Sequence, residues 1–366
     1  MKGADFSAAA QGAARAAIAP STRATYNGPA GAYQAWCRIN GRDPAAEAMT
    51  AGSVASWLAE IAPHYAPRSL SVLRAAAGSY WRDALLPGPS PTEDERVSRV
   101  VSGLVKARAR EDAAKPARPV TVALTAELLL AASPFGNRPW QQRSPREEML
   151  WAAATLGVYG LLRPGELLGS ARDRSRAARA DAVTFYVAAN GLATRAVAPI
   201  TPAPAELPDH FTLRLGVTKA DPLARNADHP ISAPTAVAAL WRWMHTRAAI
   251  GLPTEGPLFA LPHPQGGVET LSCAALCKEI ARWIALATGN PPPKLTGRCF
   301  RKGGASALLG GGAAVPTIMQ SGRWSTPAMV GVYASADAKR RRALAAGRRM
   351  DAAATAAAAA PAPRRL

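Results

Sequence analysis

The sequence predicts a mainly α-helical protein of the α+β class, with an N-terminal helical bundle and a C-terminal mixed domain that holds one small antiparallel sheet. Apolar residues recur at helical spacing through most of the 366 positions. Strand-like alternation is confined to about residues 182–232, and a basic segment with two prolines interrupts the helical pattern near residue 115. A chain of this length suits two domains, each with its own core.

The N-terminal domain is expected over residues 21–114, after an alanine-rich lead-in at residues 1–20 that we expect to be disordered. Capping residues and apolar periodicity predict four helices in this domain. Their predicted positions are a start at Ser21 or Thr22, a start after Thr50, residues 68–86 and residues 93–111. Together they predict a compact bundle.

Residues 115–120 are the predicted linker, because Pro116 and Pro119 cannot continue a helix. The second domain is expected over residues 121–350, followed by an alanine- and proline-rich tail at residues 351–366 that we expect to be disordered. Helices are predicted near residues 125–132, 146–161, 234–249, 271–288, 301–309 and 315–321, and strands at 183–187, 212–217 and 229–231. The helix at residues 146–161 is strongly apolar and should lie in the core.

The charge of the chain favours a polyanionic partner. Lys and Arg number 44 against 25 Asp and Glu, a formal net charge of +19. No uninterrupted apolar run is long enough to span a bilayer, so nucleic acid is favoured over an anionic membrane surface. A bias towards arginine throughout the sequence is the alternative explanation. The four cysteines predict neither a disulfide framework nor a zinc site, which fits an intracellular protein.

An arginine stands where one predicted helix ends and another begins. Pro164 disfavours helical geometry at Arg163 and suits the first position of the next helix, whose first turn contains Glu166. A rigidly held arginine presents a planar fork of donors that matches two phosphate oxygens. A structural pair between Arg163 and Glu166 is the alternative.

Two further motifs follow. Arg298 and Arg301 share one helix face, with Lys302 beside them and glycines next along the chain, which makes an anion site or a basic surface turn. Thr326 and Pro327 predict the start of a helix whose second turn holds Tyr333. Taken alone, Tyr333 and Trp324 would both be interpreted as core residues.

In order and spacing, Arg163, Arg298-x-x-Arg301, Trp324 and Tyr333 resemble the signature of the tyrosine recombinase and integrase family, especially its Cre-like members. Tyr333 lies nine positions after Trp324, and Trp324 lies 23 positions after Arg301. Lys219 falls where that family has a lysine in a β-hairpin. The resemblance covers roughly residues 21–345, and it implies that the bundle is a SAM-like core-binding domain and the second domain is catalytic.

The resemblance implies a site-specific DNA recombinase or integrase, encoded by a mobile element, with Tyr333 as the nucleophile of a 3′-phosphotyrosyl intermediate. Arg163, Arg298 and Arg301 would neutralise the phosphate and Trp324 would donate its indole N–H. Lys219 would be the general acid, and Glu166 would orient the arginines. No metal or cofactor is expected. Double-stranded DNA is the expected partner, with self-association to a tetramer on paired DNA sites. Further residues that we expect to contact DNA are Arg68, Arg74, Lys106, Arg118, Lys302 and Arg323.

One position departs from the family pattern. The family usually has His or Lys where this chain has Arg298, and arginine stays protonated and cannot accept a proton from tyrosine. A catalytically weak or inactive DNA-binding protein of the same fold is therefore an alternative function. A type IB topoisomerase, with the same chemistry but acting alone, is another, and an RNA- or membrane-binding basic protein is the most distant.

Overall fold

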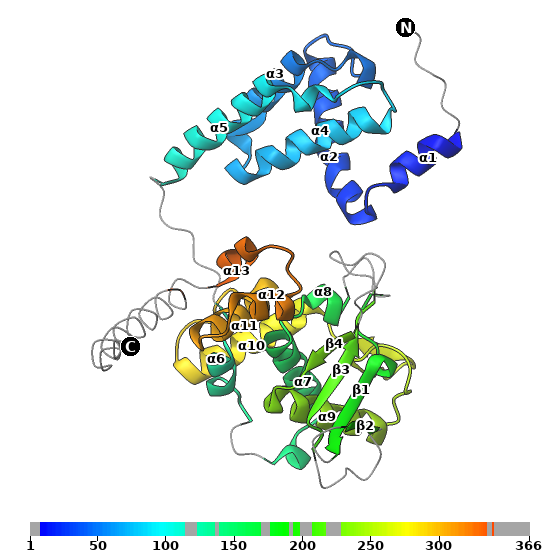
Figure 1. The fold of residues 1–366 in the computed structure, drawn as a ribbon, viewed down its shortest axis with the longest axis vertical. Helices are drawn as coiled ribbons and strands as arrows, with labels where there is room; N and C mark the ends of the chain where they lie inside the picture. The colour runs from blue at the N-terminus through cyan, green and yellow to red at the C-terminus, as the bar shows by residue number, and fades with distance from the viewer. Residues whose placement is uncertain are drawn as a thin grey trace, which may run out of the picture. The chain divides into compact units, whose positions relative to one another are not determined.

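A computed structural model of the chain describes residues 8–113, 123–135, 139–169, 176–189, 193–197, 207–216, 228–334 and 339. The chain divides into two compact units, residues 1–120 and 121–366, drawn in Figure 1. The predicted linker at 115–120, the tail at 351–366, Arg118 and Lys219 lie outside the described residues. Most of the described chain is helical, and strands occur only in the second unit, so the predicted α+β class is confirmed.

The described part of the first unit contains the four predicted α-helices and one more. They are α1 (Ala8–Ala16), α2 (Pro20–Ile39), α3 (Ala51–Ile61), α4 (Leu70–Asp83) and α5 (Glu95–Ala113). Helix α1 corrects our expectation of a disordered lead-in at residues 8–16. Six of its nine residues are alanine, the best helix former, and the helix packs against α4.

Local chemistry accounts for the start of α3 and for the core of this unit. The Thr50 hydroxyl accepts the Ser53 backbone N–H at 3.0 Å, and the Ser53 hydroxyl accepts the Thr50 backbone N–H at 3.0 Å. This reciprocal cap satisfies two amide groups that the helix leaves unpaired. The Ser53 hydroxyl also lies 2.8 Å from that of Tyr33, whose ring packs edge-on against fully buried Trp57. The bundle therefore has a core of its own.

The second unit begins with α6 (Ala126–Ala131), α7 (Pro145–Tyr159) and the single turn α8 (Pro164–Leu167). After the sheet come α9 (Pro234–Ala249), α10 (Cys273–Thr288), α11 (Arg298–Gly310), α12 (Val315–Gly322) and α13 (Pro327–Tyr333). Each predicted helix is present, with α11 starting three residues earlier than expected. None of the helices in the described part of the chain is long and apolar enough to cross a membrane.

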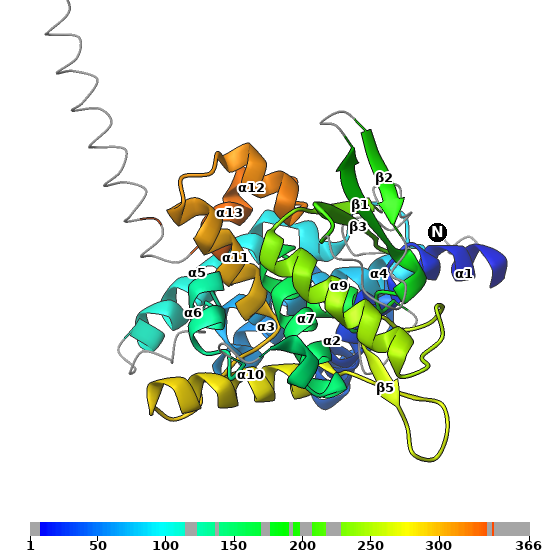
Figure 2. The same ribbon diagram turned by 90° about the horizontal axis from the view of Figure 1, so that it is seen from below.

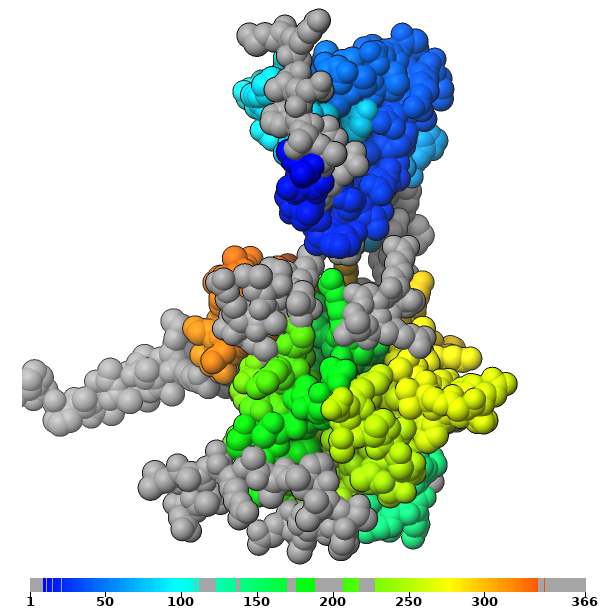
Figure 3. Space-filling model, turned by 90° about the vertical axis from the view of Figure 1, so that its right-hand side faces the viewer, coloured from blue at the N-terminus to red at the C-terminus, as the bar shows by residue number. Residues whose placement is uncertain are grey.

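A four-stranded antiparallel sheet has the order β2-β1-β3-β4. Its strands are β1 (Val183–Ala189), β2 (Ala193–Val197), β3 (His210–Arg214) and β4 (Asp228–Ile231). Strand β2 was not predicted, because its sequence Ala-Thr-Arg-Ala-Val lacks a clear apolar alternation and the strand lies at an edge. The short hairpin of β5 (Ala260–Pro262) and β6 (Val268–Thr270) was also missed. Figure 3 shows the sheet residues in green beside the yellow-green and yellow segment of this hairpin.

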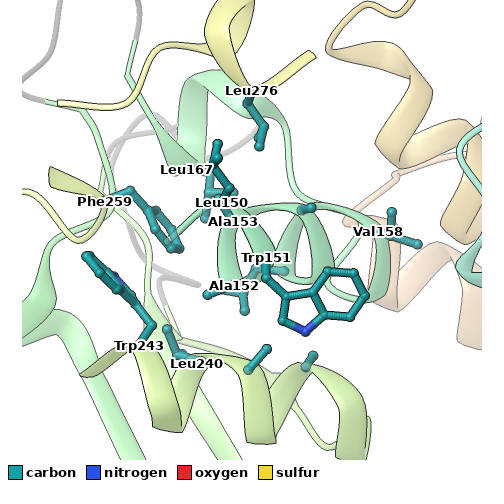
Figure 4. Packing of buried hydrophobic residues seen from close by; sticks show 14 of the residues in the cluster. Leu150, Trp151, Ala152, Ala153, Val158, Leu167, Leu240, Trp243, Phe259 and Leu276 are labelled. Carbon is teal, nitrogen blue, oxygen red and sulfur yellow. The ribbon is translucent and has the colours of Figure 1, made fainter. Parts of the chain in front are cut away.

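Helix α7 is the centre of the second core, as its apolar sequence predicted. Its residues from Glu148 to Val158 are all buried, and it packs mainly against α9. Figure 4 shows Ala152 of α7 near Leu240 of α9 and Leu150 of α7 near Leu167, with Trp243 beside Phe259. Helix α11 packs on α7 and also contacts α12 and α13, and Figure 2 shows these three helices grouped together. The turn after α7 is thereby brought against the C-terminal helices.

Gly303 of α11 allows the closest backbone contact in this region. A Cβ there would lie 1.7 Å from the Leu124 carbonyl oxygen, whereas a Cβ at Gly331 of α13 would meet nothing within 4 Å. Gly303→Ala should therefore destabilise the second unit by about 1–3 kcal/mol, the usual range for overpacking. Gly331→Ala is the matched control and should be neutral or stabilising by up to about 1 kcal/mol. Urea unfolding measures both, and equal effects of the two variants would contradict this packing.

Candidate active site

Arg301 is the most deeply buried charged group of the predicted site, with 1% of its surface exposed. Its Nε donates to the Leu161 carbonyl at 2.7 Å, and its Nη2 donates to the Gly322 carbonyl. Leu161 belongs to the turn after α7, and Gly322 is the last residue of α12. One guanidinium on α11 therefore joins two turns that are 161 positions apart in the sequence.

Arg163 and Glu166 form the pair that the sequence predicted at the start of α8. The Arg163 backbone N–H donates to Glu166 Oε2 at 2.9 Å, and Arg163 Nη1 donates to Oε1 at 2.6 Å. Pro164 occupies the first position of the helix. The carboxylate is buried, whereas the Arg163 side chain is one-third exposed. Arg163 is thus held at its base and reaches the surface at its tip.

Arg323 also contacts Glu166, through Nη2 to Oε2. It follows α12 as the C-cap residue in a left-handed conformation, with φ 52° and ψ 51°. Arg323 is one of the residues that we expected to contact DNA; in the structure its side chain is 17% exposed and lies against the buried carboxylate. Glu166 therefore lies between two arginines.

Tyr333 and Trp324 lie against this cluster. Their rings stack with centroids 5.0 Å apart and planes 15° apart, and the Arg301 guanidinium carbon is 5.5 Å from the Trp324 ring and 6.0 Å from the Tyr333 ring. A small core that includes Leu309, Ile318 and Val330 supports both aromatic residues. Pro327 begins α13 as predicted, and Thr326 is the N-cap residue, although its side chain makes no capping hydrogen bond. The half-buried Tyr333 closes that helix.

The cluster has more positive than negative charge. Burial and the neighbouring Arg163 lower the pKa of Arg301 to about 10, so that its guanidinium is still cationic at neutral pH. Burial alone would raise the pKa of Glu166, but the charge of Arg323 and the bonds from Arg163 outweigh it and lower that pKa. The cluster thus contains three guanidinium groups and one carboxylate, and that carboxylate pairs with two of them. An anion would balance this charge.

Several donors of the cluster are buried without an acceptor among the described residues. They are Nη1 of Arg301, Nε and Nη1 of Arg323, and the indole Nε1 of Trp324. Buried N–H groups are nearly always hydrogen-bonded in folded proteins, so unpaired donors on adjacent residues require an explanation. An oxyanion such as a phosphate group would accept from these donors and supply the missing negative charge.

Other predicted residues lie outside these contacts. Arg298 is exposed at the first position of α11, and Lys302 is half-buried on the same helix. In the first unit Arg68 and Lys106 are exposed, whereas Arg74 donates to the Ser98 hydroxyl at 2.9 Å. No group of His, Cys, Asp and Glu residues that could hold a metal occurs in the described ranges.

His229 of β4 is a neighbour that sequence reasoning did not single out. Its Nε2 lies 2.8 Å from the Gly160 carbonyl, and its side chain is buried. Burial first, and then the charge of Arg323, lower the pKa of His229 to about 4. The sequence could not predict that His229 lies beside the arginine cluster, because its contact with the Gly160 carbonyl depends on how β4 packs against the turn after α7.

No protein-family model and no curated protein matches the sequence. Among solved structures, the chain is similar to XerA recombinase, with 12% identity, 86% of this chain and 96% of that chain covered, and a TM-score of 0.38. It is similar to the Tn1549 transposon integrase in complex with transposon right end DNA, with 13% identity, 82% of this chain and 87% of that chain covered, and a TM-score of 0.44. It is also similar to the XerH site-specific recombinase in a post-cleavage complex with its difH substrate, with 12% identity, 86% of this chain and 75% of that chain covered, and a TM-score of 0.47. At such low identities and TM-scores, this likeness alone decides nothing about what the present chain does.

The lowered pKa of His229 predicts a loss of stability in acid. The unfolded chain takes up a proton near the ordinary histidine pKa of about 6.5, whereas the folded protein does so only near pH 4. Stability is therefore lost as the pH falls from about 6.5 towards 4, by about 2 kcal/mol between pH 7 and pH 5.

Urea unfolding at the two pH values tests this, because carboxylates contribute equally to the wild type and to its variants. His229→Gln retains a donor for the Gly160 carbonyl. Between pH 7 and pH 5 its free energy of unfolding should fall by about 2 kcal/mol less than that of the wild type. His64→Gln, which removes an exposed histidine, should behave like the wild type. An unchanged pH dependence in His229→Gln would show that folding does not lower the pKa of His229.

Proposed function

We propose that this chain is a site-specific DNA recombinase or integrase of the tyrosine recombinase kind, which cuts and rejoins DNA strands through a covalent link to Tyr333. The observation that carries the proposal is the stacking of Tyr333 on Trp324 beside the buried guanidinium of Arg301. A tyrosine next to a cationic cluster with unpaired donors has what phosphoryl transfer to a phenol oxygen requires.

In the proposed reaction, the Tyr333 hydroxyl gives up its proton to water and its oxygen attacks the scissile phosphorus. The new phosphorus–oxygen bond gives a 3′-phosphotyrosyl link, and the bond to the 5′-oxygen breaks. Arg301 and Arg163 neutralise the charge that develops on the non-bridging oxygens, and Trp324 offers its indole N–H. Because Arg301 is already fixed by two carbonyls, it needs no rearrangement when the charge develops. This reaction uses no metal or cofactor.

Lys219 is the proposed general acid for the leaving 5′-oxygen. It lies in the sequence between β3 and β4. These two strands pair antiparallel, with Phe211 opposite Ile231 at one end and Arg214 opposite Asp228 at the other. Arg298 is the proposed clamp for a phosphate oxygen, since its exposed position at the start of α11 leaves it accessible to DNA. As an arginine, it stays protonated and does not serve as the base for Tyr333.

Double-stranded DNA is the proposed partner of both units. The net charge of +19 supports it, and exposed Arg68 and Lys106 of the first unit are proposed phosphate contacts, together with Arg74, Arg118 and Lys302. Recombination further requires self-association on paired sites, proposed here as a tetramer. A type IB topoisomerase would cut DNA by the same chemistry without strand exchange between two duplexes, so a strand-exchange assay separates the two functions.

Replacing the nucleophile tests the proposal most simply. Tyr333→Phe should abolish the covalent DNA adduct while binding DNA nearly as well as the wild type, because the ring that stacks on Trp324 remains. The wild type is incubated with suicide duplexes selected from a random pool, and the adduct is mapped by mass spectrometry. Tyr186→Phe, a half-buried tyrosine of β1, is the matched control and should keep the adduct. An adduct on any other residue would refute the assignment.

The Arg298 position separates an active recombinase from an inactive DNA-binding protein. Arg298→Ala should slow single-turnover cleavage by about 10²- to 10³-fold, the effect of losing one preorganised donor. Arg298→Lys should keep partial activity, and Arg298→His should be active because it restores a group that exchanges protons near neutral pH. Cleavage at saturating protein is the measurement. An inactive wild type with an active Arg298→His would favour the DNA-binding function, and full activity of Arg298→Ala would exclude Arg298 from the site.

A further inference from the structure

Arg323 has a backbone conformation that side chains rarely adopt. Three non-glycine residues with positive φ occur in the described ranges, namely Leu85, Leu161 and Arg323. Two of them are next to the hydrogen bonds of Arg301. Leu161 supplies the carbonyl that accepts from Arg301 Nε, and Arg323 directly follows Gly322, whose carbonyl accepts from Arg301 Nη2. Strained backbone of this kind tends to gather at functional sites, where the surrounding structure holds it in place.

Ending α12 does not by itself require an arginine. The left-handed C-cap of a helix is the position at which glycine is most favourable, because glycine has no Cβ to clash there. In α10 of the same unit the left-handed C-cap is indeed Gly289. The side chain of Arg323 must therefore be explained by what its guanidinium contacts.

Only one of the three guanidinium nitrogens of Arg323 is hydrogen-bonded to the described part of the protein. Nη2 pairs with Glu166, whereas Nε and Nη1 are buried and have no acceptor among the described residues. Glu166 is already bonded to Arg163 through its other oxygen, so one carboxylate serves two arginines. Structural pairing alone would leave two donors of Arg323 desolvated without compensation, which is unfavourable in a folded protein.

We propose that Arg323 is a phosphate-binding residue of this site, in which one of its two unpaired nitrogens, Nε or Nη1, donates to a phosphate oxygen while Nη2 remains on Glu166. Glu166 then aligns Arg163 on one side and Arg323 on the other, and the unpaired donors of Arg301 and Trp324 complete the set. The ligand class is a tetrahedral phosphate group. That this phosphate is the scissile group of DNA rests on the proposed function.

The first test uses inorganic phosphate as the probe and needs no DNA sequence. Phosphate that binds the folded site raises the melting temperature with its concentration, and the dependence yields an affinity. Arg323→Gly keeps the left-handed backbone and removes the guanidinium, so phosphate affinity should fall by about 10-fold or more. Arg323→Lys keeps the charge without the planar fork and should also lose affinity, which covers the case that Arg323→Gly does not fold.

Arg179→Ala is the matched control. It removes one arginine of the same unit that pairs on the surface with Asp181, and its phosphate affinity should stay within about twofold of the wild type, as expected for an exposed pair. The proposal is overturned if the wild type shows no phosphate-dependent stabilisation, or if Arg323→Gly or Arg323→Lys binds phosphate as the wild type does.

The same variants are then tested for covalent trapping on suicide DNA. Wild-type trapping that is lost in Arg323→Gly, together with lost phosphate affinity, supports both the inference and the proposed function. Phosphate binding that depends on Arg323 in a protein that traps no DNA supports the inference and rejects the proposed reaction. Trapping that is unaffected by Arg323→Gly refutes the role of Arg323 at the scissile phosphate and leaves the proposed function standing.

Discussion

The burial of the Arg301 guanidinium is the constraint around which the second unit is arranged. A charge with 1% exposure needs partners for its donors, and Nε and Nη2 of Arg301 bond the carbonyls of Leu161 and Gly322, whereas Nη1 has no acceptor among the described residues. Both carbonyls are available because the backbone turns sharply beside them, at Leu161 itself and at Arg323 after Gly322. The turn after α7 places Arg163 and Glu166, and the turn after α12 places Trp324. One side chain thereby fixes the position of the others.

The same constraint leaves the site incomplete. Glu166 is a single carboxylate among three guanidinium groups, and several N–H donors face no acceptor within the described part of the chain. Proteins usually avoid this combination, because each unpaired donor loses its hydration without gaining a partner. The arrangement becomes favourable when an oxyanion enters, and the stacked rings of Trp324 and Tyr333 place a phenol beside that position. The electrostatic imbalance is thus a physical reason to expect anion binding.

Much of this arrangement could be predicted from the sequence, since it depends on local signals. The apolar run of α7, the joint at Pro164 and the proline that begins α13 follow from periodicity and helix-end chemistry, and the structure has each of them. The order and spacing of the arginines, Trp324 and Tyr333 carried the family resemblance, and the structure brings four of the predicted residues into contact with Arg301 or with each other.

What could not be predicted depends on tertiary packing. Arg323 carries no signal that separates a surface arginine from one bent back by a left-handed backbone, and His229 was one residue of a strand. Strand β2 was missed because an edge strand needs little apolar alternation. Helix α1 was missed because an alanine-rich segment is compatible both with disorder and with a helix that has a neighbour to pack against.

Crystals of the protein soaked in tungstate show whether the buried arginine cluster is a phosphate site. Tungstate has the shape and charge of phosphate, and its anomalous scattering locates it without ambiguity. We expect an anion within hydrogen-bond distance of Arg301 and Arg163, on the side where the indole N–H of Trp324 and the hydroxyl of Tyr333 lie. Tungstate bound only at exposed residues such as Arg298, with this cluster left empty, would show that the cluster is not a phosphate site.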